Sequence, residues 1–467
     1  MKNKAYMLVV SFVCFLLFFI FFNYYNYGFE FAESDYKLPA GTIDCYSNKM
    51  GCKLVSLKRT IEYCDEWYEY QNIKELNCSY TIQGTDKVNL ISDPANHIKS
   101  KWTDERYNVE ILRYGSFSGV RLYKIPLIGN LISFLKIRTA ILTPWDMEFL
   151  PDGSFLITRK DGKVLHLKNG HLSIIATLPV INEKMAGLLG LAVHPEFDHN
   201  GYIYLFYTYS YDSNQGSGSS KFLVKSRISR FTYKGVLTDE AVILDDIPGT
   251  IIHSGGRLGI GPDGKLYATT GVDVKNSQNI SLLSGKILRI NLDGSIPEDN
   301  PFNNSYTFSY GHRNPQGLAW DENGQLYASE HGPWRYDELN KIEKGGNYGW
   351  AIKRCDEAFK ESNKSNNVLI DPIFCFKNYT LAPSGMAFVN DRNQKWHGDL
   401  FVAGLRGEHL HKFDLNNGKI VNDEIFYVNA ESPVSSAFYR RLRDVEYFNG
   451  SLWVLSDFAG IIKITPD

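Results

Sequence analysis

Short runs of alternating apolar and polar residues recur from about residue 110 to the C-terminus. Each run is followed by a turn rich in Asp, Asn and Gly and then by a second apolar or aromatic run, as in "WDMEFLPDGSFLITRKDGKVLHL". The alternation predicts strands with one buried face, and Asp-Gly or Asn-Gly accepts the positive φ of a tight hairpin. Six such units begin near Trp145, Gly187, Gly255, Asn314, Ser384 and Leu442.

The unit starts lie roughly 40 to 70 residues apart, which suits four-stranded blades with loops of unequal length. Gly, Tyr and Phe are abundant and long helical patterns are scarce, which also favours strands. We therefore predict an all-β fold, a six-bladed β-propeller over residues 106–467. A β-sandwich is the alternative, but it does not explain why the same turn pattern recurs.

The N-terminus carries a targeting signal. Lys2 and Lys4 precede an unbroken apolar run from Met7 to Phe22, and tyrosines follow it. No small-x-small cleavage site follows, and tyrosines suit a membrane interface, so residues 1–30 are predicted to be an uncleaved anchor. A cleaved signal sequence and a buried soluble helix are the alternatives. Because the positive charges stay inside, both targeting interpretations place the rest of the chain outside the cytoplasm, as a periplasmic, cell-surface or secreted protein.

Residues 31–105 are polar, contain cysteines and lack the repeat, so we predict a small appendage there. The cysteines outside the apolar run are Cys45, Cys52, Cys64, Cys78, Cys355 and Cys375. Their even number suits disulfides in an oxidising compartment, with the first four paired among themselves and the last two closing one loop. A zinc site is the rival, but no paired CxxC spacing or histidine partner supports it.

The net charge of −2 excludes a basic surface for nucleic acid, which needs excess cations to neutralise phosphates. No dinucleotide fingerprint placed after a strand, P-loop or HExxH motif is present.

Polar residues stand where several predicted strands begin. His253 precedes a glycine pair and Arg257, "GHRNPQG" contains Arg313 and Asn314, "GLRGEH" contains Arg406, and "RRLRDV" contains Arg441 and Arg443. A lone histidine is commonly structural and arginines are commonly solvated. Arginines that recur at the starts of blades instead suggest an inward cluster for an anionic, planar ligand. The segment "SEHGPWRYDELNKIEKGGNYGW" is either a hard-cation site or a well-turned surface loop.

Eight segments, in this order, resemble the signatures of the quinoprotein aldose dehydrogenase family, whose cofactor is pyrroloquinoline quinone (PQQ). They include "PWDMEFLPDG", "GLLGLAVHPEF", "HSGGRLGIGPDGKLY", "GHRNPQGLAW" and "APSGMAF". The resemblance covers roughly residues 110–467. It implies oxidation of aldose sugars to lactones, with electrons passed to a quinone or other external acceptor.

The resemblance also implies residue roles. His253 would be the base that takes the sugar hydroxyl proton, oriented by Asp273, and Arg313 would polarise the quinone oxygen. The residues implied to hold PQQ are Asn314, Thr380, Arg406, Arg441 and Arg443. Backbone carbonyls of Gly332 and Pro333 would bind a calcium ion beside PQQ, and Glu338 and Tyr348 match positions of a second calcium site.

The chain departs from the family pattern at three places. Met185 and Ala186 stand where Gln or Glu is usual, and Val272 stands where an Asp normally orients the histidine, with Asp273 one residue late. Arg406 replaces a lysine. The alternative function is therefore a non-catalytic extracellular propeller that binds a protein or glycan, similar to the Hedgehog-interacting-protein-like branch. The chain retains His253 together with the arginines at the blade starts, which favours the enzyme. A lactonase-type propeller is a third possible function.

Overall fold

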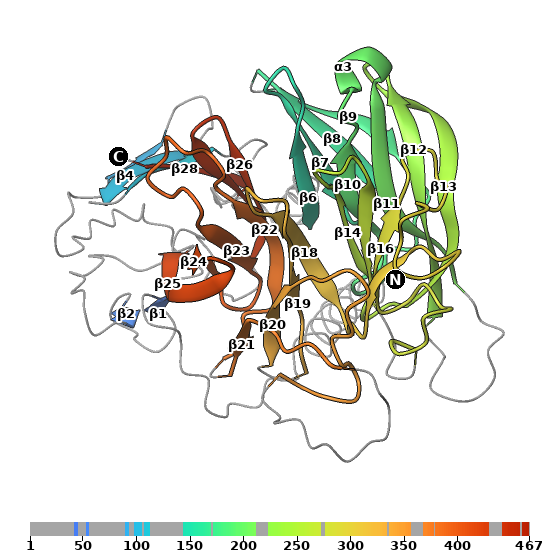
Figure 1. Cartoon of the computed structure of the whole chain (residues 1–467). Coiled ribbons are helices and arrows are strands. Elements are labelled where there is room, and N and C mark those ends of the chain that lie inside the picture. Colours follow the sequence, from blue (N-terminus) through green and yellow to red (C-terminus); the bar gives the residue numbers. More distant parts are fainter. Residues whose placement is uncertain are drawn as a thin grey trace, which may run out of the picture. The chain divides into compact units, whose positions relative to one another are not determined.

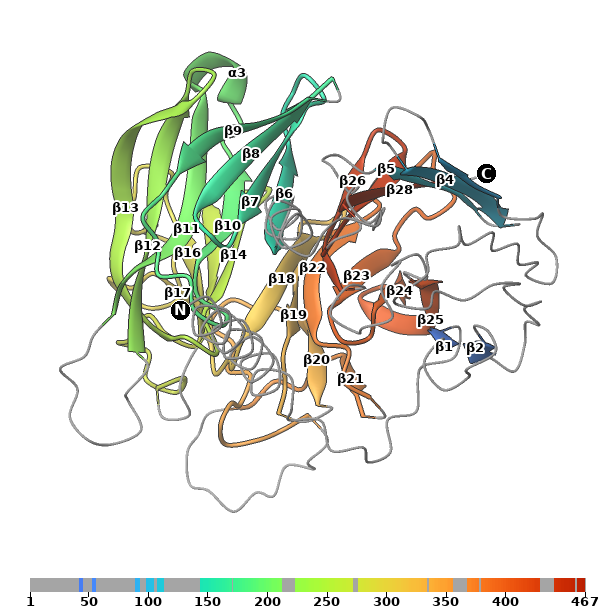
Figure 2. The ribbon, with the colours of Figure 1, turned by 180° about the vertical axis from the view of Figure 1, so that it is seen from behind.

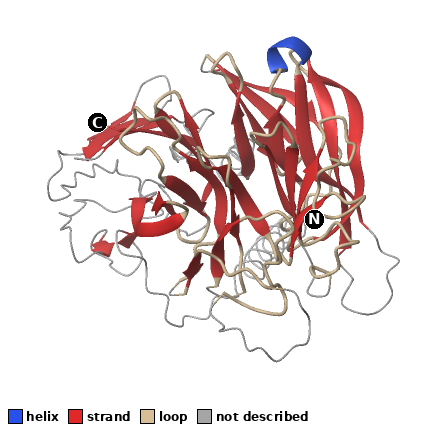
Figure 3. Ribbon diagram, viewed as in Figure 1, coloured by secondary structure: helices blue, strands red, loops and turns tan. Residues whose placement is uncertain are grey.

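The protein is described by a computed structural model over residues 42–44, 53–55, 89–92, 98–104, 107–112, 143–169, 171–211, 223–271, 276–333, 336–355, 368–377, 379–428, 441–457 and 460–466. Regular structure in these ranges is almost all β-strand (Figure 3). The one helix in them is α3 (Phe197–Asn200), a single turn that ends at Gly201 in the left-handed conformation.

Six sheets follow one another along the chain (Figure 1). Blade 1 comprises β6 (Pro144–Phe149), β7 (Phe155–Arg159), β8 (Lys163–Lys168) and β9 (His171–Thr177). Blade 2 comprises β10 (Leu188–Val193), β11 (Tyr202–Tyr211), β12 (Leu223–Tyr233) and β13 (Leu237–Thr250). Blade 3 comprises β14 (Gly255–Ile260), β15 (Leu266–Thr270), β16 (Lys286–Ile290) and β17 (Thr307–Tyr310).

The remaining sheets complete the set. Blade 4 comprises β18 (Pro315–Trp320), β19 (Leu326–Glu330), β20 (Asp337–Lys341) and β21 (Phe374–Phe376). Blade 5 comprises β22 (Pro383–Phe388), β23 (Leu400–Gly404), β24 (His409–Asn416) and β25 (Lys419–Val428). Blade 6 comprises β26 (Leu442–Phe448), β27 (Ser451–Ser456) and β28 (Gly460–Pro466), joined by β5 (Tyr107–Leu112), β4 (Ile98–Asp104) and β3 (Asn89–Ser92).

The first strands of the six blades form a closed ring, because β6, β10, β14, β18, β22 and β26 contact one another in that order and β26 contacts β6. This confirms the predicted six-bladed propeller, and each first strand starts within one residue of a predicted unit start. The ring is closed within blade 6, where β28 from the C-terminus pairs with β5 from the N-terminal side (Figure 2).

The hairpins within blades form for the reason that the sequence suggests. In the turn after β6, Gly153 has φ +79°, and Asp152 accepts the amide of Ser154 at 2.9 Å. The backbone of Leu150 then bonds to Ser154 at 2.7 Å, which brings β7 beside β6. A residue with a Cβ atom is strained at such a positive φ, so glycine sets the turn.

Apolar side chains fill the spaces between adjacent sheets. Between blades 2 and 3, for example, buried Tyr204 and Phe206 of β11 share a cluster with Leu266 and Ala268 of β15. Full burial of one such large apolar side chain contributes about 1.5–3 kcal/mol, and each interface contains many of them. Packing between blades therefore supplies most of the stability and fixes the inner strands that carry the polar residues.

A buried ion-pair group links the inner strands across the ring. Arg257 of β14 contacts the carboxylate of Asp146 in β6, lies 3.2 Å from Asp444 in β26, and donates from Nε to the Gln316 carbonyl of β18 at 2.9 Å. Burial and the neighbouring Asp146 raise the pKa of Asp444 well above its ordinary value, although Arg257 opposes the shift. One buried arginine thus pairs with two buried carboxyl groups. Of these two, Asp444 favours its protonated form.

The N-terminal predictions fall mostly outside the described residues. This applies to the predicted anchor at residues 1–30 and to Cys45, Cys52, Cys64 and Cys78. No helix in the described ranges is long and apolar enough to cross a membrane. Of the predicted appendage, β1 (Thr42–Asp44) pairs with β2 (Lys53–Val55), whereas β3 and β4 belong to the sheet of blade 6. That sheet therefore includes residues before the predicted boundary at 106.

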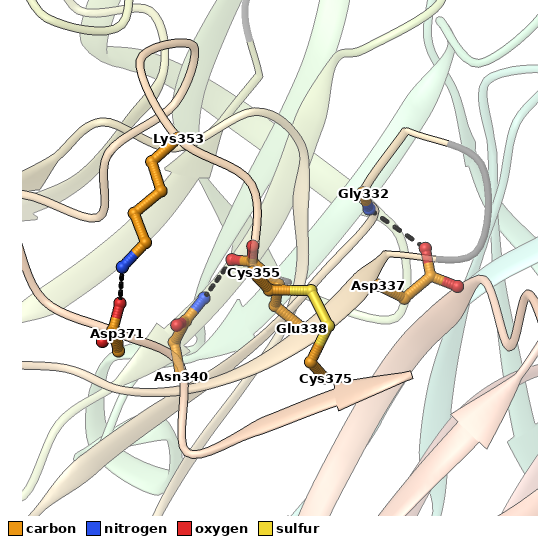
Figure 4. The surroundings of a disulfide bond; sticks show 8 residues. All are labelled: Gly332, Asp337, Glu338, Asn340, Lys353, Cys355, Asp371 and Cys375. Atoms are coloured by element: carbon orange, nitrogen blue, oxygen red, sulfur yellow. Dashed lines mark hydrogen bonds and ion pairs between the residues drawn. A yellow bond between two sulfur atoms is a disulfide. The ribbon is translucent and has the colours of Figure 1, made fainter. Parts of the chain in front are cut away.

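Cys355 and Cys375 form the predicted disulfide, with Cα atoms 5.9 Å apart (Figure 4). The bond joins the segment after Trp350 to β21, the last strand of blade 4.

Candidate active site

The predicted site residues gather where the first strands begin. Register shifts occur near the start of all six first strands, for example between Gly255 and Leu258 and between Leu442 and Asp444. Such bulges re-aim side chains and are frequent beside functional sites. They explain why polar residues interrupt the apolar alternation at this end of the ring.

His331, a histidine that was not predicted, lies close to the predicted site residues. Its Nε2 atom is 2.8 Å from the carbonyl oxygen of Pro383, and its Nδ1 atom is 3.3 Å from Nδ2 of Asn314. Burial lowers the pKa of His331 to about 3, and the charges of Arg313, His253 and Arg443 add to the shift. His331 is therefore neutral, donates to the Pro383 carbonyl from Nε2, and lies close to Arg313, His253 and Arg443.

Arg313 is held rigidly but keeps an unused donor. Its Nη1 atom donates to the His331 carbonyl at 3.0 Å, and its guanidinium lies 5.3 Å from the ring centroid of Trp350. Its Nε atom is buried and has no hydrogen-bond partner among the described residues. Burial lowers the pKa of Arg313, opposed by acidic neighbours that include Glu330, but the group remains a cation. A buried donor on a fixed cation calls for an acceptor, and an anionic ligand supplies one.

Asn314 forms hydrogen bonds with the loop that contains His253, the candidate base. Its side-chain oxygen accepts from the Gly255 amide at 3.1 Å and from Gln316 at 3.0 Å. In the same loop the His253 amide donates to Oγ1 of Thr250 at 2.9 Å, and His253 itself is half-buried. The amide of Asn314 thus positions His253 relative to blade 4.

A cluster of cations lies at the start of β26. Arg443 makes a two-point ion pair with Asp457, at 2.8 Å from Nε and 2.9 Å from Nη2. Burial lowers the pKa of Arg441, and the positive charges of Arg443 and Arg406 add to this effect. Burial likewise lowers the pKa of Lys160, at the end of β7, to about 8, with Arg443 contributing.

This cation cluster therefore comprises Lys160, Arg406, Arg441 and Arg443, opposed by the carboxylates of Asp457 and Glu408. Four positive and two negative groups leave a net charge of about +2 in a partly desolvated place. Like charges held this closely are stabilised when an anion binds between them.

Thr380 lies beside the turn that carries Arg406. The carbonyl of the next residue, Leu381, accepts the amides of Arg406 and Gly407, both at 3.0 Å. The structure therefore brings Thr380 and Arg406 to the same place, although they belong to different segments of the chain.

Two acidic residues, Asp337 and Glu338, lie in the predicted calcium segment, with Asp337 beside Gly332 (Figure 4). Burial raises the pKa of Asp337 to about 6, although its carboxylate accepts amides from Gly332 at 3.0 Å and Ala382 at 2.7 Å. Burial and the charge of Glu330 raise the pKa of Glu338 to about 8. Two buried carboxyl groups with raised pKa values therefore lie in the predicted calcium segment.

Tyr348 does not offer its hydroxyl group to a metal. The hydroxyl donates to the Lys341 carbonyl at 2.6 Å and accepts the Glu343 amide at 2.8 Å, while its ring stacks on His312 at 4.7 Å. Any contribution from Tyr348 to a cation site is therefore through its backbone.

A model of the family described as glucose/sorbosone dehydrogenase matches residues 141–463 of the chain. The protein belongs to the glucose/sorbosone dehydrogenase family. This confirms the family resemblance and the expected class of enzyme, an oxidoreductase family of sugar dehydrogenases.

Relatives in the glucose/sorbosone dehydrogenase family are similar over most of the propeller. Aldose sugar dehydrogenase of Escherichia coli is 30% identical over 69% of this chain and 90% of its own length. Quinoprotein glucose dehydrogenase B of Acinetobacter calcoaceticus is 38% identical over 55% of this chain and 60% of its own. The PQQ-bound structure of aldose sugar dehydrogenase from Streptomyces coelicolor has a TM-score of 0.60 and 29% identity, and covers 78% of this chain and 99% of that one.

The similarity to the other predicted branch is more limited. Human Hedgehog-interacting protein is 31% identical over 29% of this chain and 22% of its own length.

Two residues of this candidate site, Lys160 and His331, were not predicted from the sequence. Lys160 stands in an ordinary hairpin, "TRKDG", and His331 stands in a segment that was interpreted for its backbone oxygens. The available signal for His331 was its place directly before Gly332, in the same segment as the predicted calcium ligands.

Of the positions that depart from the family pattern, Met185, Ala186 and Arg406 belong to the described residues. Val272 and Asp273 lie outside the described residues, so the proposed partner of His253 stays a prediction. The Met185 amide donates to the carbonyl of Ile251 at 2.8 Å, which places this departure against the loop of His253.

Proposed function

We propose that the protein oxidises aldose sugars at C1 to lactones, with PQQ as cofactor, calcium as its partner ion, and a quinone or other external electron acceptor. The observation that carries the proposal is the cation cluster together with the buried, unused Nε donor of Arg313. A planar cofactor with several carboxylates matches this combination of excess positive charge and fixed donors. The names of the relatives, quinoprotein glucose dehydrogenase and aldose sugar dehydrogenase, point to the same chemistry.

Each side chain has a distinct task in this proposal. Arg406, Arg441 and Arg443 bind cofactor carboxylates, with Asn314 and Thr380 as neutral partners. When bound, PQQ supplies the acceptor for the hydride that leaves C1 of the sugar.

Proton transfer and charge stabilisation belong to two other residues. His253 takes the proton of the C1 hydroxyl, because neutral imidazole is a base of suitable strength near neutral pH. Arg313 donates a hydrogen bond to the oxygen where negative charge develops. Removal of one proton and one hydride from the sugar leaves the C1 carbonyl of the lactone, so the charges balance.

The acidic group around Gly332 is the proposed calcium site. Backbone carbonyls of Gly332 and Pro333 would bind the ion, with Glu338 and the backbone of Tyr348 at a second position. Support comes from the buried carboxylate of Asp337 beside Gly332 and from Glu338, whose pKa is raised by burial and by the charge of Glu330.

We further propose that residues 7–22 anchor the propeller outside the cytoplasm. The flanking lysines and tyrosines support this orientation. Protease added to cells whose outer layers have been removed but whose cytoplasmic membrane is intact should remove the propeller and spare the apolar segment. Complete protection of the propeller there would contradict the proposal.

The function is tested with the purified full-length chain, dialysed against chelator and then supplied with PQQ and Ca²⁺. We expect cofactor absorbance to remain with the protein after gel filtration, and a redox dye to be reduced when aldoses are added. Samples without PQQ or without Ca²⁺ are the controls.

A non-catalytic binding propeller is the second candidate, favoured by Val272 where the family pattern has an Asp. Absence of both PQQ binding and dye reduction in the wild-type protein would contradict the enzyme. Restoration of dye reduction by Val272→Asp would then identify a decayed dehydrogenase.

A further inference from the structure

Blade 5 contains a buried group of polar rings that has no role in the proposed function, although it adjoins Thr380 and the turn of Arg406. His409 and His411 are two apart on β24, so their side chains lie on one face of the strand. Both are almost fully buried, with exposed fractions of 0% and 3%. Tyr379, in the linker between β21 and β22, approaches both rings, and Asp423 of β25 approaches one. We call Tyr379, His409, His411 and Asp423 the His409 cluster.

Three atoms of this cluster form a nearly equilateral triangle. Nε2 of His409 is 3.3 Å from Nδ1 of His411, and the hydroxyl oxygen of Tyr379 is 3.4 Å from the first and 3.3 Å from the second. Ligands at about 2.0–2.1 Å around a tetrahedral metal ion are separated by about 3.3–3.4 Å. The triangle therefore has the dimensions of one face of a tetrahedral coordination shell.

The outer nitrogen of each ring is already engaged. Nδ1 of His409 lies 2.7 Å from the carbonyl oxygen of Gly407, so it carries a proton and donates. Nε2 of His411 lies 3.0 Å from Oδ2 of Asp423 and likewise donates. Histidines that bind metals commonly donate their other N–H group to a backbone carbonyl or a carboxylate, and this cluster contains one example of each.

These outer hydrogen bonds determine what the inner atoms can do. In neutral rings, the inner nitrogens of His409 and His411 both present lone pairs to each other. The hydroxyl group of Tyr379 has one proton, which can make only one well-directed hydrogen bond to either nitrogen. A cation at the centre of the three atoms satisfies both lone pairs and the phenol oxygen at once.

We propose that Tyr379, His409 and His411 bind a divalent transition-metal ion of the zinc type in tetrahedral geometry, with Asp423 orienting His411. Two imidazole nitrogens and one oxygen suit zinc, cobalt and copper better than calcium. No group of three or more His, Cys, Asp or Glu side chains in the described ranges is placed to hold a metal, so the tyrosine is what completes this set. Solvent fills the fourth position, because Tyr379 is only half-buried.

The bound ion would join two blades. Tyr379 follows β21 of blade 4, whereas the histidines belong to β24 of blade 5. Aromatic rings of Phe376 and Phe413 pack against His411 at 5.4 and 4.7 Å and keep bulk water from that side. Its metal would therefore stabilise the folded ring, because the ion binds only the native arrangement.

The test uses the full-length chain freed of metal by chelator and titrated with Co²⁺ and then Zn²⁺. We expect one ion per chain to give the visible absorption bands of tetrahedral cobalt(II), and Zn²⁺ to displace it. Asp423→Asn should weaken binding about 10–100-fold, the usual effect of removing a partner of a ligating histidine. His166→Gln is the matched control, because His166 is a strand histidine that bonds Ser154 and Tyr233 and should leave the bands unchanged.

Two variants separate loss of ligation from loss of folding. His409→Gln should abolish the bands, and Tyr379→Phe, which keeps the packed ring, should change their energy and weaken binding while circular dichroism stays native. The proposal is overturned if wild-type protein gives no tetrahedral bands, or if Tyr379→Phe and His409→Gln both bind cobalt as the wild type does. In that event the cluster is a hydrogen-bonded core element only.

Discussion

Removal of Arg257 from its buried ion-pair group should destabilise the ring. Arg257, Asp146 and Asp444 have side-chain exposures of only 5%, 3% and 2%. Substitution Arg257→Met keeps much of the side-chain volume but leaves two carboxyl groups buried without their cation. Breaking a buried pair by removing one partner costs about 3–5 kcal/mol. We therefore expect the free energy of unfolding to fall by about this amount.

A surface pair provides the matched control. Arg392 pairs with Glu322 at 3.1 Å, but its side chain is 80% exposed. Solvent screens such a pair, so Arg392→Met should change the free energy of unfolding by less than about 1 kcal/mol. Chemical denaturation followed by tryptophan fluorescence, with linear extrapolation to zero denaturant, measures both variants.

The pH dependence tests the same reasoning independently. Removal of Arg257 leaves an uncompensated carboxylate, whose pKa in the folded state rises above its unfolded value because burial disfavours the charge. The penalty is then present above the folded pKa and is relieved as pH falls through it. The deficit of Arg257→Met relative to wild type should shrink between about pH 7 and pH 4. A deficit equal to that of Arg392→Met, or one that grows on acidification, would refute the electrostatic account.

Three further predictions concern the proposed active site. His253→Asn should lower kcat at least about 10²-fold while PQQ binding, followed by absorbance, stays near the wild-type level. Arg443→Leu should weaken PQQ binding about 10- to 100-fold in a fluorescence titration, because a charged hydrogen-bond partner is lost; unchanged affinity would remove Arg443 from the cofactor site. Burial and Arg443 lower the pKa of Lys160 to about 8, and a bound anion raises it, so PQQ affinity should fall as pH rises through about 8. Lys160→Met should lack that decrease, and an identical pH profile in the variant would contradict the assignment.

The sequence predicted the propeller because its signal is local and repeated. Asp-Gly and Asn-Gly turns between alternating runs report hairpins directly, and the inner strands start where those patterns start. The disulfide between Cys355 and Cys375 was also predictable, because these two cysteines lie 20 residues apart and far along the chain from the other four. The sequence did not indicate that β3 and β4 extend blade 6, because pairing with β5 depends on ring closure rather than on any repeat.

The site was harder to predict because its members meet only in three dimensions. Arg313 and Arg443 stand at blade starts, where polar residues interrupt the apolar alternation, and so the sequence indicates them. Lys160 lies at the end of a second strand, in a turn that looks like a solvated hairpin. Only the folded structure places Lys160 near Arg441 and Arg443, whose charges lower its pKa. Likewise, the His409 cluster unites a linker with two strands. The sequence shows that His409 and His411 are two apart, but it does not show that Tyr379 and Asp423 approach them.

Closure of blade 6 by strands from opposite ends of the chain has a consequence for synthesis. β5 leaves the ribosome before the other blades, but its partner β28 (Gly460–Pro466) is synthesised after all the other strands of the ring. The growing chain must therefore carry β5 with an unpaired edge until the last strand of blade 6 has been made. Exposed edges are templates for pairing with other chains, so a premature stop before β28 should yield aggregates rather than a soluble five-bladed fragment. Expression of this protein is accordingly expected to depend on chaperones that bind during elongation.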